Sequence, residues 1–254
     1  MKITTFLFLI LAILIGADPA FVEGSEKNRL DTIQQGNAFY LEGRYEKAIT
    51  AYESALSPEY NNGFLHYNLG NAYLRSDSLG LAILHYLKAR QWIPDNDELA
   101  ANLRLAFLKT KDRSSALETD ESNPVFFWID SMNFKETIWI CLAFYALFWG
   151  IMAVWLYKRT KVWSQMRWLA LTLFIFTAAG SGLKFFQYNS SPLGVILAST
   201  VEVKSAPGPD NTTVVELHEG AVFKIHQRRE GWNQILISKG KSGWVPEQSL
   251  GLLP

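Results

Sequence analysis

The chain has 254 residues, enough for one or two domains, and its 24 basic and 24 acidic side chains balance to a net charge of zero. A neutral chain gives no bulk electrostatic argument for nucleic acid as a partner. The single cysteine, Cys141, excludes an intrachain disulfide, so an exported domain of this chain must be stabilised by packing alone.

The N-terminus, residues 1–22, has the three-part pattern of a secretory signal peptide. Lys2 precedes an apolar run from Phe6 to Ile15, and small residues follow that run. The run of about ten residues is short for a spanning helix. An uncleaved signal anchor is the alternative, and either version exports the segment that follows.

A repeat with a period of 34 residues runs from Arg29 to Ala106. The paired positions are Gly36 and Gly70, Asn37 and Asn71, Phe39 and Tyr73, Ala48 and Ala82, Tyr52 and Tyr86, and Ala55 and Ala89. This pattern of small and aromatic residues resembles the tetratricopeptide repeat. The resemblance implies an all-α module over 27–109, with helices at 27–41, 45–56, 63–75 and 79–92 and a capping helix at 97–111. Two repeats are few for independent stability, so the cap or a partner protein must supply the rest.

In the family that it resembles, the first helix of each pair lines a concave groove that binds peptides. Carried over to this chain, the groove would present Ile33, Asn37, Tyr40, Tyr67, Asn71 and Arg75. Two asparagines at the same repeat position would be able to clamp a peptide backbone or a carboxylate. The alternative is that both are solvated surface residues.

A polar linker at 110–123 leads to an aromatic segment at 124–135, which is typical of a short helix in the membrane interface. The alternative for this segment is the irregular beginning of a spanning helix. Two apolar segments follow, at 138–157 and 168–186, and each of about 20 residues is long enough to cross a hydrocarbon core of about 30 Å. The small residues at 178–182 favour close packing against the first span or against a span of a partner.

The connector between the two spans, at 158–167, is basic, with Lys158, Arg159, Lys161 and Arg167 and no acidic residue. Short basic loops stay in the cytoplasm, so both long flanks are expected on the opposite side of the membrane. A helical hairpin buried in a soluble core is the alternative.

From residue 193 to 254 the sequence changes to short β-rich runs separated by turn residues, which predicts a small all-β barrel. Val201 and Val203, Gly231 and Trp232, and Gly243, Trp244 and Val245 resemble the bacterial SH3 domain. That resemblance implies binding of peptides or cell-wall material, with Trp232 and Trp244 as the candidate residues. The alternative is that both tryptophans belong to the core.

No motif for catalysis, a cofactor or a metal accompanies these modules. The four histidines, at 66, 85, 218 and 226, lack metal-ligand spacing, and Gly240, Lys241 and Ser242 lack the glycine and the helix of a phosphate-binding loop. We therefore expect no enzymatic activity.

As a whole, this multidomain architecture resembles the BatE-type membrane proteins of the Bacteroides aerotolerance operon. The resemblance implies a non-catalytic scaffold in the bacterial inner membrane, with the repeats and the SH3-like domain in the periplasm. Its partners would be membrane proteins with von Willebrand factor A domains and a MoxR-type ATPase, in tolerance of oxygen or envelope stress. The alternative function is a cell-wall sensor whose barrel binds peptidoglycan.

Overall fold

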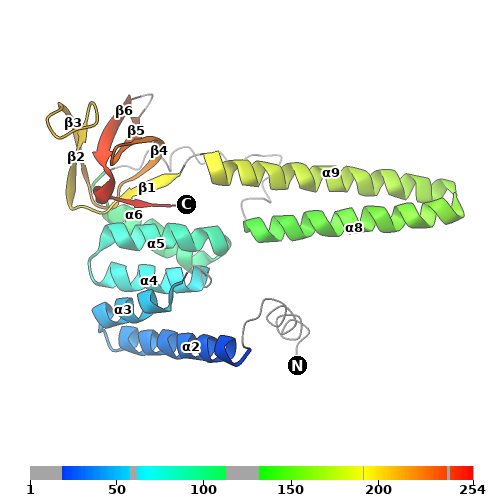
Figure 1. Ribbon diagram of the computed structural model, residues 1–254, viewed down its shortest axis with the longest axis horizontal. Coiled ribbons are helices and arrows are strands. Elements are labelled where there is room, and N and C mark those ends of the chain that lie inside the picture. The colour runs from blue at the N-terminus through cyan, green and yellow to red at the C-terminus, as the bar shows by residue number, and fades with distance from the viewer. Residues whose placement is uncertain (1–18, 58–61, 113–131, 191, 239–240, 254) are drawn as a thin grey trace.

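The computed structural model describes residues 19–57, 62–112, 132–190, 192–238 and 241–253 (Figure 1). Within them lie helical repeats, a long helical hairpin and an antiparallel all-β domain, so the predicted fold class is confirmed. Most of the predicted signal peptide, at 1–18, and most of the predicted linker and interfacial segment, at 113–131, lie outside the described residues.

The repeats consist of five helices: α2 (Pro19–Leu41), α3 (Tyr45–Ala55), α4 (Gly63–Arg75), α5 (Leu79–Trp92) and α6 (Asp97–Lys109). Asn62 and Asn96 set the start of α4 and α6, because their side-chain oxygens accept hydrogen bonds from the N–H groups of Leu65 and Leu99. Helix α2 begins at Pro19 rather than at residue 27, and α6 ends at Lys109 rather than at residue 111.

Each helix pair closes around a glycine and a tyrosine at equivalent positions. A Cβ atom at Gly36 would lie 2.6 Å from Cε1 of Tyr52, and one at Gly70 would lie 2.5 Å from Cδ1 of Tyr86. Both rings are almost completely buried. Glycine is therefore required sterically, because a side chain at either position would displace the ring that fills the space between the helices.

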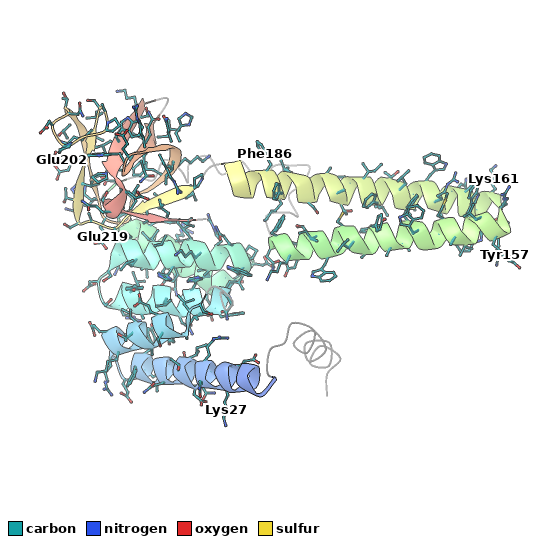
Figure 2. The ribbon with its side chains drawn as sticks, in the orientation of Figure 1. Lys27, Tyr157, Lys161, Phe186, Glu202 and Glu219 are labelled. Carbon is teal, nitrogen blue, oxygen red and sulfur yellow. The ribbon has the colours of Figure 1, made fainter. Side chains whose placement is uncertain are left out.

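The hairpin is formed by α8 (Phe134–Lys158) and α9 (Lys161–Ser190), both long and apolar enough to cross a membrane (Figure 1). A capping box between Asn133 and Glu136 begins α8, so the last two residues of the predicted interfacial segment already belong to this helix. The turn holds only Arg159 and Thr160 and is shorter than the predicted connector, because α9 begins at Lys161. Tyr157 and Lys161 mark this tip in Figure 2.

The two long helices pack along their length. Oγ of Ser181 donates a hydrogen bond of 3.1 Å to the carbonyl oxygen of Thr137, and the rings of Tyr145 and Phe174 lie 5.5 Å apart. Gly182, in the same run of small residues, faces open space. Only part of that run therefore serves the contact between α8 and α9.

The β domain has seven strands: β1 (Leu193–Ile196), β2 (Thr200–Lys204), β3 (Thr213–His218), β4 (Val222–Arg229), β5 (Trp232–Ser238), β6 (Lys241–Pro246) and β7 (Leu250–Leu252). They form one sheet in the order β3-β2-β6-β5-β4-β1-β7, with antiparallel neighbours. Its buried core includes Val203, Phe223, Ile235 and Val245.

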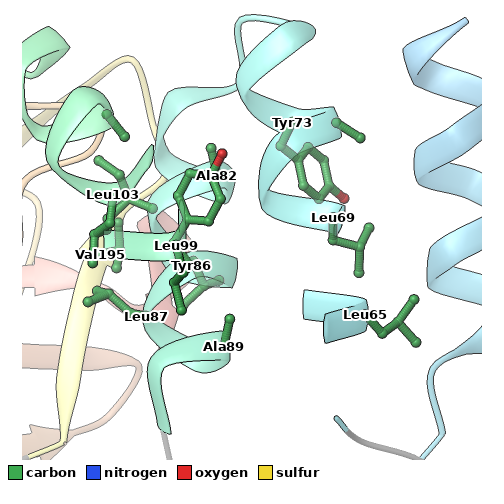
Figure 3. Packing of buried hydrophobic residues seen from close by; sticks show 14 of the residues in the cluster. Leu65, Leu69, Tyr73, Ala82, Tyr86, Leu87, Ala89, Leu99, Leu103 and Val195 are labelled. Carbon is green, nitrogen blue, oxygen red and sulfur yellow. The ribbon is translucent and has the colours of Figure 1, made fainter. Parts of the chain in front are cut away.

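The β domain packs directly on the second repeat. Val195, Val222 and Leu253 belong to the same hydrophobic cluster as the buried residues of α4, α5 and α6 (Figure 3). A Cβ atom at Gly251 would lie 2.5 Å from Cδ2 of Leu84, so strand and helix are in close contact. The missing stabilisation of a two-repeat module therefore comes from the barrel of the same chain.

Polar contacts fix this junction at two points. The carboxylate of Glu219 accepts a hydrogen bond of 2.7 Å from the N–H of Gly80, in the first turn of α5. The carboxylate of Asp112, after α6, accepts one of 2.5 Å from the N–H of His218, whose ring also lies 3.2 Å from it. Because repeats and barrel form one packed body, they must lie on the same side of any membrane that the hairpin crosses.

Candidate functional site

The inner helices α2 and α4 carry the predicted groove residues, and the two asparagines prove to be part of a hydrogen-bond ladder. Oδ1 of Asn37 accepts a hydrogen bond of 2.8 Å from the Tyr52 hydroxyl and one of 3.4 Å from Nδ2 of Asn68. Oδ1 of Asn71 accepts a hydrogen bond of 2.8 Å from the Tyr86 hydroxyl. The ladder thus joins the two helices within each repeat.

The second rung continues into the capping helix. Nδ2 of Asn102 donates a hydrogen bond of 2.9 Å to Oδ1 of Asn71 and one of 3.1 Å to the Tyr67 hydroxyl. The Tyr67 hydroxyl in turn donates a hydrogen bond of 3.3 Å to a carboxylate oxygen of Glu98. Asn68 and Asn102 are themselves one period apart, so the sequence held a signal for these partners that the groove prediction did not use.

The Nδ2 groups of Asn37 and Asn71 differ in what they contact. In the part of the chain that the structure describes, Nδ2 of Asn37 donates no hydrogen bond, whereas the side chain of Asn71 also contacts the Tyr67 hydroxyl; both side chains are at least partly exposed. Nδ2 is a donor only, so it suits a carbonyl or carboxylate oxygen of a bound segment.

The other predicted groove residues divide into two kinds. Ile33 and Tyr40 are half-buried and pack against the core of the repeats, so each contributes only part of its surface. Arg75 is exposed, and its contact with the Tyr40 hydroxyl raises the pKa of the guanidinium. Leu105 and Leu108 on α6, 48% and 77% exposed, were not predicted and add apolar surface.

A buried histidine pair lies inside the second repeat. Nδ1 of His66 and Nδ1 of His85 are 2.9 Å apart, and the ring of Tyr73 stacks on His85 with 5.4 Å between ring centres. Burial, with a smaller contribution from Lys88, lowers the pKa of His66 to about 4. Burial and the neighbouring His66 lower the pKa of His85 to about 3. Both rings are therefore neutral near pH 7.

The first repeat has an open hollow at the equivalent place, where, among the described residues, no helix covers α2 as α3 covers α4. This hollow has a volume of about 310 Å³ and is lined by Thr32, Gln35, Phe39, Lys47, Thr50, Ala51 and Ser54. Thr32, Phe39 and Ala51 correspond by the 34-residue period to His66, Tyr73 and His85. Polar side chains such as Thr32 and Gln35 contribute to the lining, but most of its surface is apolar.

The two tryptophans predicted for the barrel differ in exposure. Trp244 on β6 is 8% exposed, whereas Trp232 begins β5 and is half-buried.

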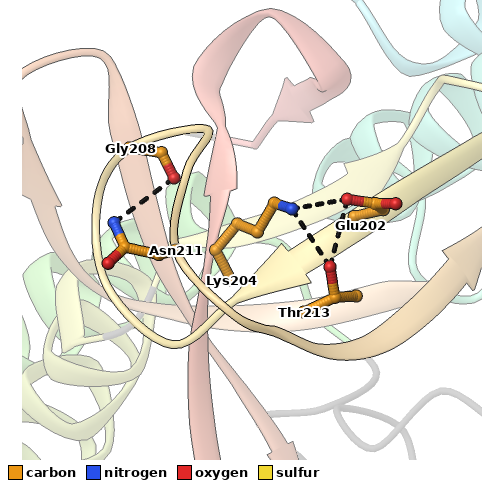
Figure 4. Close-up of polar contacts among 5 residues, drawn as sticks. All are labelled: Glu202, Lys204, Gly208, Asn211 and Thr213. Atoms are coloured by element: carbon orange, nitrogen blue, oxygen red, sulfur yellow. Dashed lines mark hydrogen bonds and ion pairs between the residues drawn. The ribbon is translucent and has the colours of Figure 1, made fainter.

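Polar side chains join strands β2 and β3 of the barrel. Nζ of Lys204 donates a hydrogen bond of 2.5 Å to Glu202 and one of 3.0 Å to Thr213 (Figure 4). These hydrogen bonds, and the charge of Lys204, lower the pKa of the Glu202 carboxyl. Nδ2 of Asn211 donates to the carbonyl oxygens of Pro207 and Gly208 and shapes the turn between these strands.

Neither module offers a centre for chemistry. Among the described residues, no group of three or more histidine, cysteine, aspartate or glutamate side chains could hold a metal ion. Within the described ranges the histidine pair has no third ligand of these types, and Cys141 lies within the apolar hairpin. What the described surface of the inner helices and the capping helix offers is hydrogen-bond donors, the exposed guanidinium of Arg75 and apolar side chains, which suit binding.

Comparison with known families agrees with both module assignments. Residues 36–77 match the family model of the TPR repeat, and residues 198–251 match that of the bacterial SH3 domain. Both families are typically non-catalytic interaction modules, so the chain combines two such modules with two apolar helices.

No curated protein gives a significant match to the chain. Among solved structures, NlpC2 from Trichomonas vaginalis shares 16% identity over 25% of this chain and 25% of that chain, with a TM-score of 0.23. The chain thus spans about a quarter of the length of that protein. A similarity of this extent carries no argument about function.

Proposed function

We propose that this protein is a membrane-anchored, non-catalytic scaffold whose repeats bind an extended segment of a protein partner. The observation that supports the proposal is the ladder of the inner helices, which presents the amide groups of Asn37 and Asn71 at equivalent positions and leaves Nδ2 of Asn37 as a donor for a partner. Arg75 adds a cation beside them, so an acidic or carboxylate-bearing segment has the complementary chemistry.

The ladder dictates how this proposal is tested. Replacing asparagine by alanine would remove the oxygen that accepts the hydrogen bond of the tyrosine hydroxyl. A loss of partner binding could then result from a destabilised fold as well as from a lost contact. Asn37→Asp and Asn71→Asp keep an acceptor oxygen for the tyrosines, remove the donor and add a negative charge. Asn28→Asp, on the exposed surface of α2, is the matched control.

Crosslinking in membranes followed by co-purification gives the readout. We expect the double variant of Asn37 and Asn71 to keep its thermal stability and to lose most of the partner that native protein and the Asn28→Asp control recover. Unchanged recovery from the double variant would refute binding through the ladder.

The wider proposal is that the partner belongs to an aerotolerance or envelope-stress complex of the BatE type. The order of repeats, hairpin and SH3-like domain supports this, and membrane proteins with von Willebrand factor A domains are the expected crosslinked species. Identification of the crosslinked protein by mass spectrometry tests the proposal, and a partner outside the membrane would contradict it.

We place the hairpin in the bacterial inner membrane, with the repeats and the barrel in the periplasm. The basic residues Lys158, Arg159, Lys161 and Arg167 gather around the turn between α8 and α9, which favours a cytoplasmic tip. A reporter enzyme that is active only in the periplasm should be active when it is fused after Pro254. Activity of a cytoplasm-dependent reporter at this position would contradict the topology.

The second candidate function is a cell-wall sensor, supported by the bacterial SH3 match and by the half-buried Trp232. An isolated barrel would expose Val195, Val222 and Leu253, so the test uses the whole chain in detergent. Retention on isolated peptidoglycan that is lost in Trp232→Ala would favour the sensor. No retention of native protein favours the scaffold.

A further inference from the structure

The end of α5 lies at the level where the candidate span of α8 begins. Nδ2 of Asn133, the N-cap of α8, donates a hydrogen bond of 3.3 Å to the carbonyl oxygen of Trp92, and Nζ of Lys135 lies 4.6 Å from the centre of the Trp92 ring. The candidate span starts at Phe134, between these two contacts. Trp92 therefore marks, by direct contact, the height at which the hairpin enters the membrane in the anchoring proposed above.

Helix α4 begins at the same level and runs away from the hairpin. A Cβ atom at Gly63, the first residue of α4, would lie 2.8 Å from Cβ of Trp92. Figure 1 shows α4 and α5 side by side and extending in nearly the same direction as the hairpin, with the start of α2 toward the hairpin as well. From Gly63 to Arg75, α4 rises by about 18 Å at about 1.5 Å per residue, so Arg75 lies at the end remote from the membrane.

The end of the inner helices that lies near the membrane is apolar. Leu30 on α2 and Phe64 on α4 are equivalent by the 34-residue period, and they are 49% and 62% exposed. Each lies three residues before a predicted groove residue, Ile33 or Tyr67, and therefore on the same face of its helix. The predicted groove thus continues toward the membrane as apolar surface.

The remote end of the same surface is polar and basic. Asn37 lies about 10 Å beyond Leu30 along α2, and its Nδ2 donates no hydrogen bond within the described ranges. Arg75 is exposed at the end of α4, where its guanidinium contacts the Tyr40 hydroxyl. A bound segment therefore meets apolar side chains near the membrane and donors for a carbonyl or carboxylate oxygen farther from it.

The charges beside the apolar end favour a protein segment over the lipid itself. Asp95 and Asp97, just after α5, are exposed at the membrane level, and their carboxylates are repelled by headgroup phosphates. Lys135, at the same level, is stacked on Trp92. A chain that leaves a membrane span passes through an interface rich in aromatic residues before its polar part begins. The inner helices present complementary surfaces in that order.

We propose that the segment bound by the inner helices is the first stretch of a membrane-embedded partner outside its own span. Apolar residues next to that span pack on Leu30 and Phe64, and a carbonyl or carboxylate oxygen farther along meets Asn37 and Arg75. The inference rests on the scaffold function and the anchoring proposed above. It adds which part of the partner is bound and in which direction that part runs.

The test places the photoreactive amino acid p-benzoylphenylalanine at Phe64, Leu41 or Ser54 of the full chain in intact membranes. Leu41 is 85% exposed, ends α2 and is the equivalent of Arg75, so it reports on the remote end. Ser54, an exposed residue near the end of α3, lines the hollow of the first repeat and is the control outside the groove. Mass spectrometry of the products identifies the crosslinked residues of the partner.

We expect the product at position 64 to join a residue close to a span of the partner. The product at position 41 should join a residue at least about five positions farther from that span, because an extended chain needs about five residues to cover the roughly 16 Å from Phe64 to Arg75. Position 54 should give little product. Phe64→Ser, at an exposed position, should lower the yield at position 41 at least about threefold without changing thermal unfolding.

The outcomes separate this inference from the scaffold function. Products at positions 41 and 64 that join a segment remote from any span, or that occur in the reverse order, would overturn the inference and leave the scaffold function intact. Crosslinking of lipid at position 64, with the partner found only at 41, would make the apolar end a lipid contact and would also overturn it. Equal yields at positions 54 and 64 would overturn binding along the inner helices. Absence of a protein product at both groove positions would overturn the scaffold function as well.

Discussion

Acid should destabilise the second repeat through its buried histidine pair. His66 and His85 have pKa values of about 4 and about 3 in the folded chain, against 6.5 for an ordinary histidine. Their contribution to stability is therefore complete above about pH 6.5 and is lost as the pH falls below it, because the unfolded chain then binds protons that the folded chain excludes. At about pH 5 this costs about 2 kcal/mol for each histidine, or roughly 4 kcal/mol for the pair.

The assay is thermal unfolding of the full chain in detergent at about pH 8 and about pH 5. For a body of this size, a loss of about 4 kcal/mol lowers the Tm by roughly 8–16 °C. The combined variant His66→Leu and His85→Phe keeps an aromatic ring against Tyr73 but has no titrating pair. Its Tm should change little over the same interval.

The matched control is His226→Gln, which removes an exposed histidine of β4 and should keep the acid sensitivity of the native chain. An equal fall in Tm for the native chain and the combined variant would refute the reasoning. The acid sensitivity would then come from other groups, and neutral burial of the pair would not contribute.

Three further predictions concern single side chains. Gly70→Ala should lower the free energy of unfolding by about 1–3 kcal/mol because the new Cβ meets a buried ring, whereas Gly182→Ala, in open space, should leave thermal unfolding unchanged. Glu219→Gln should weaken the cap on Gly80 and speed proteolytic cleavage between repeats and barrel, and unchanged cleavage would contradict its role. Asn233 is buried with both amide atoms unpaired among the described residues, so Asn233→Leu should raise the free energy of unfolding by about 1 kcal/mol in urea titration.

The repeat helices were predictable from the sequence because their spacing is dictated by steric need. Gly36 and Gly70 recur with Tyr52 and Tyr86 at the period that the close approach of the helices demands, and the helices at 63–75 and 79–92 have the predicted bounds. The short turn between α8 and α9 was not predicted, since nothing in the composition of 161–167 distinguishes a helix start from a loop.

The packing of barrel on repeat was missed, although α5 carried a sign of it. Ile83, Leu84 and Leu87 are buried on different sides of this helix, together with Tyr86. A helix with apolar side chains on every side must be packed against other elements on every side. The helices of two repeats are too few to cover α5 completely. The sequence cannot say which distant segment provides the cover, because contacts across the hairpin leave no periodic pattern.

The candidate site shows the same division. The recurrence of Asn37 and Asn71 indicated a function for these residues, and the structure gives their oxygen atoms a role in cohesion between helices. Binding by the opposite amide atom stays a prediction. A periodic pattern identifies equivalent positions but does not separate atoms that hold the fold together from atoms that face a partner.

The junction between α5 and the barrel also orders the biosynthesis of the chain. Ribosomes complete the repeats first, and the apolar surface of α5 that Val195, Val222 and Leu253 later cover then has no partner within the nascent chain. Both helices of the hairpin must be made before the covering strands follow. Such a delay is the condition in which nascent proteins need chaperones. Deletion of residues 192–254 should therefore leave the repeats dependent on a chaperone and open to degradation.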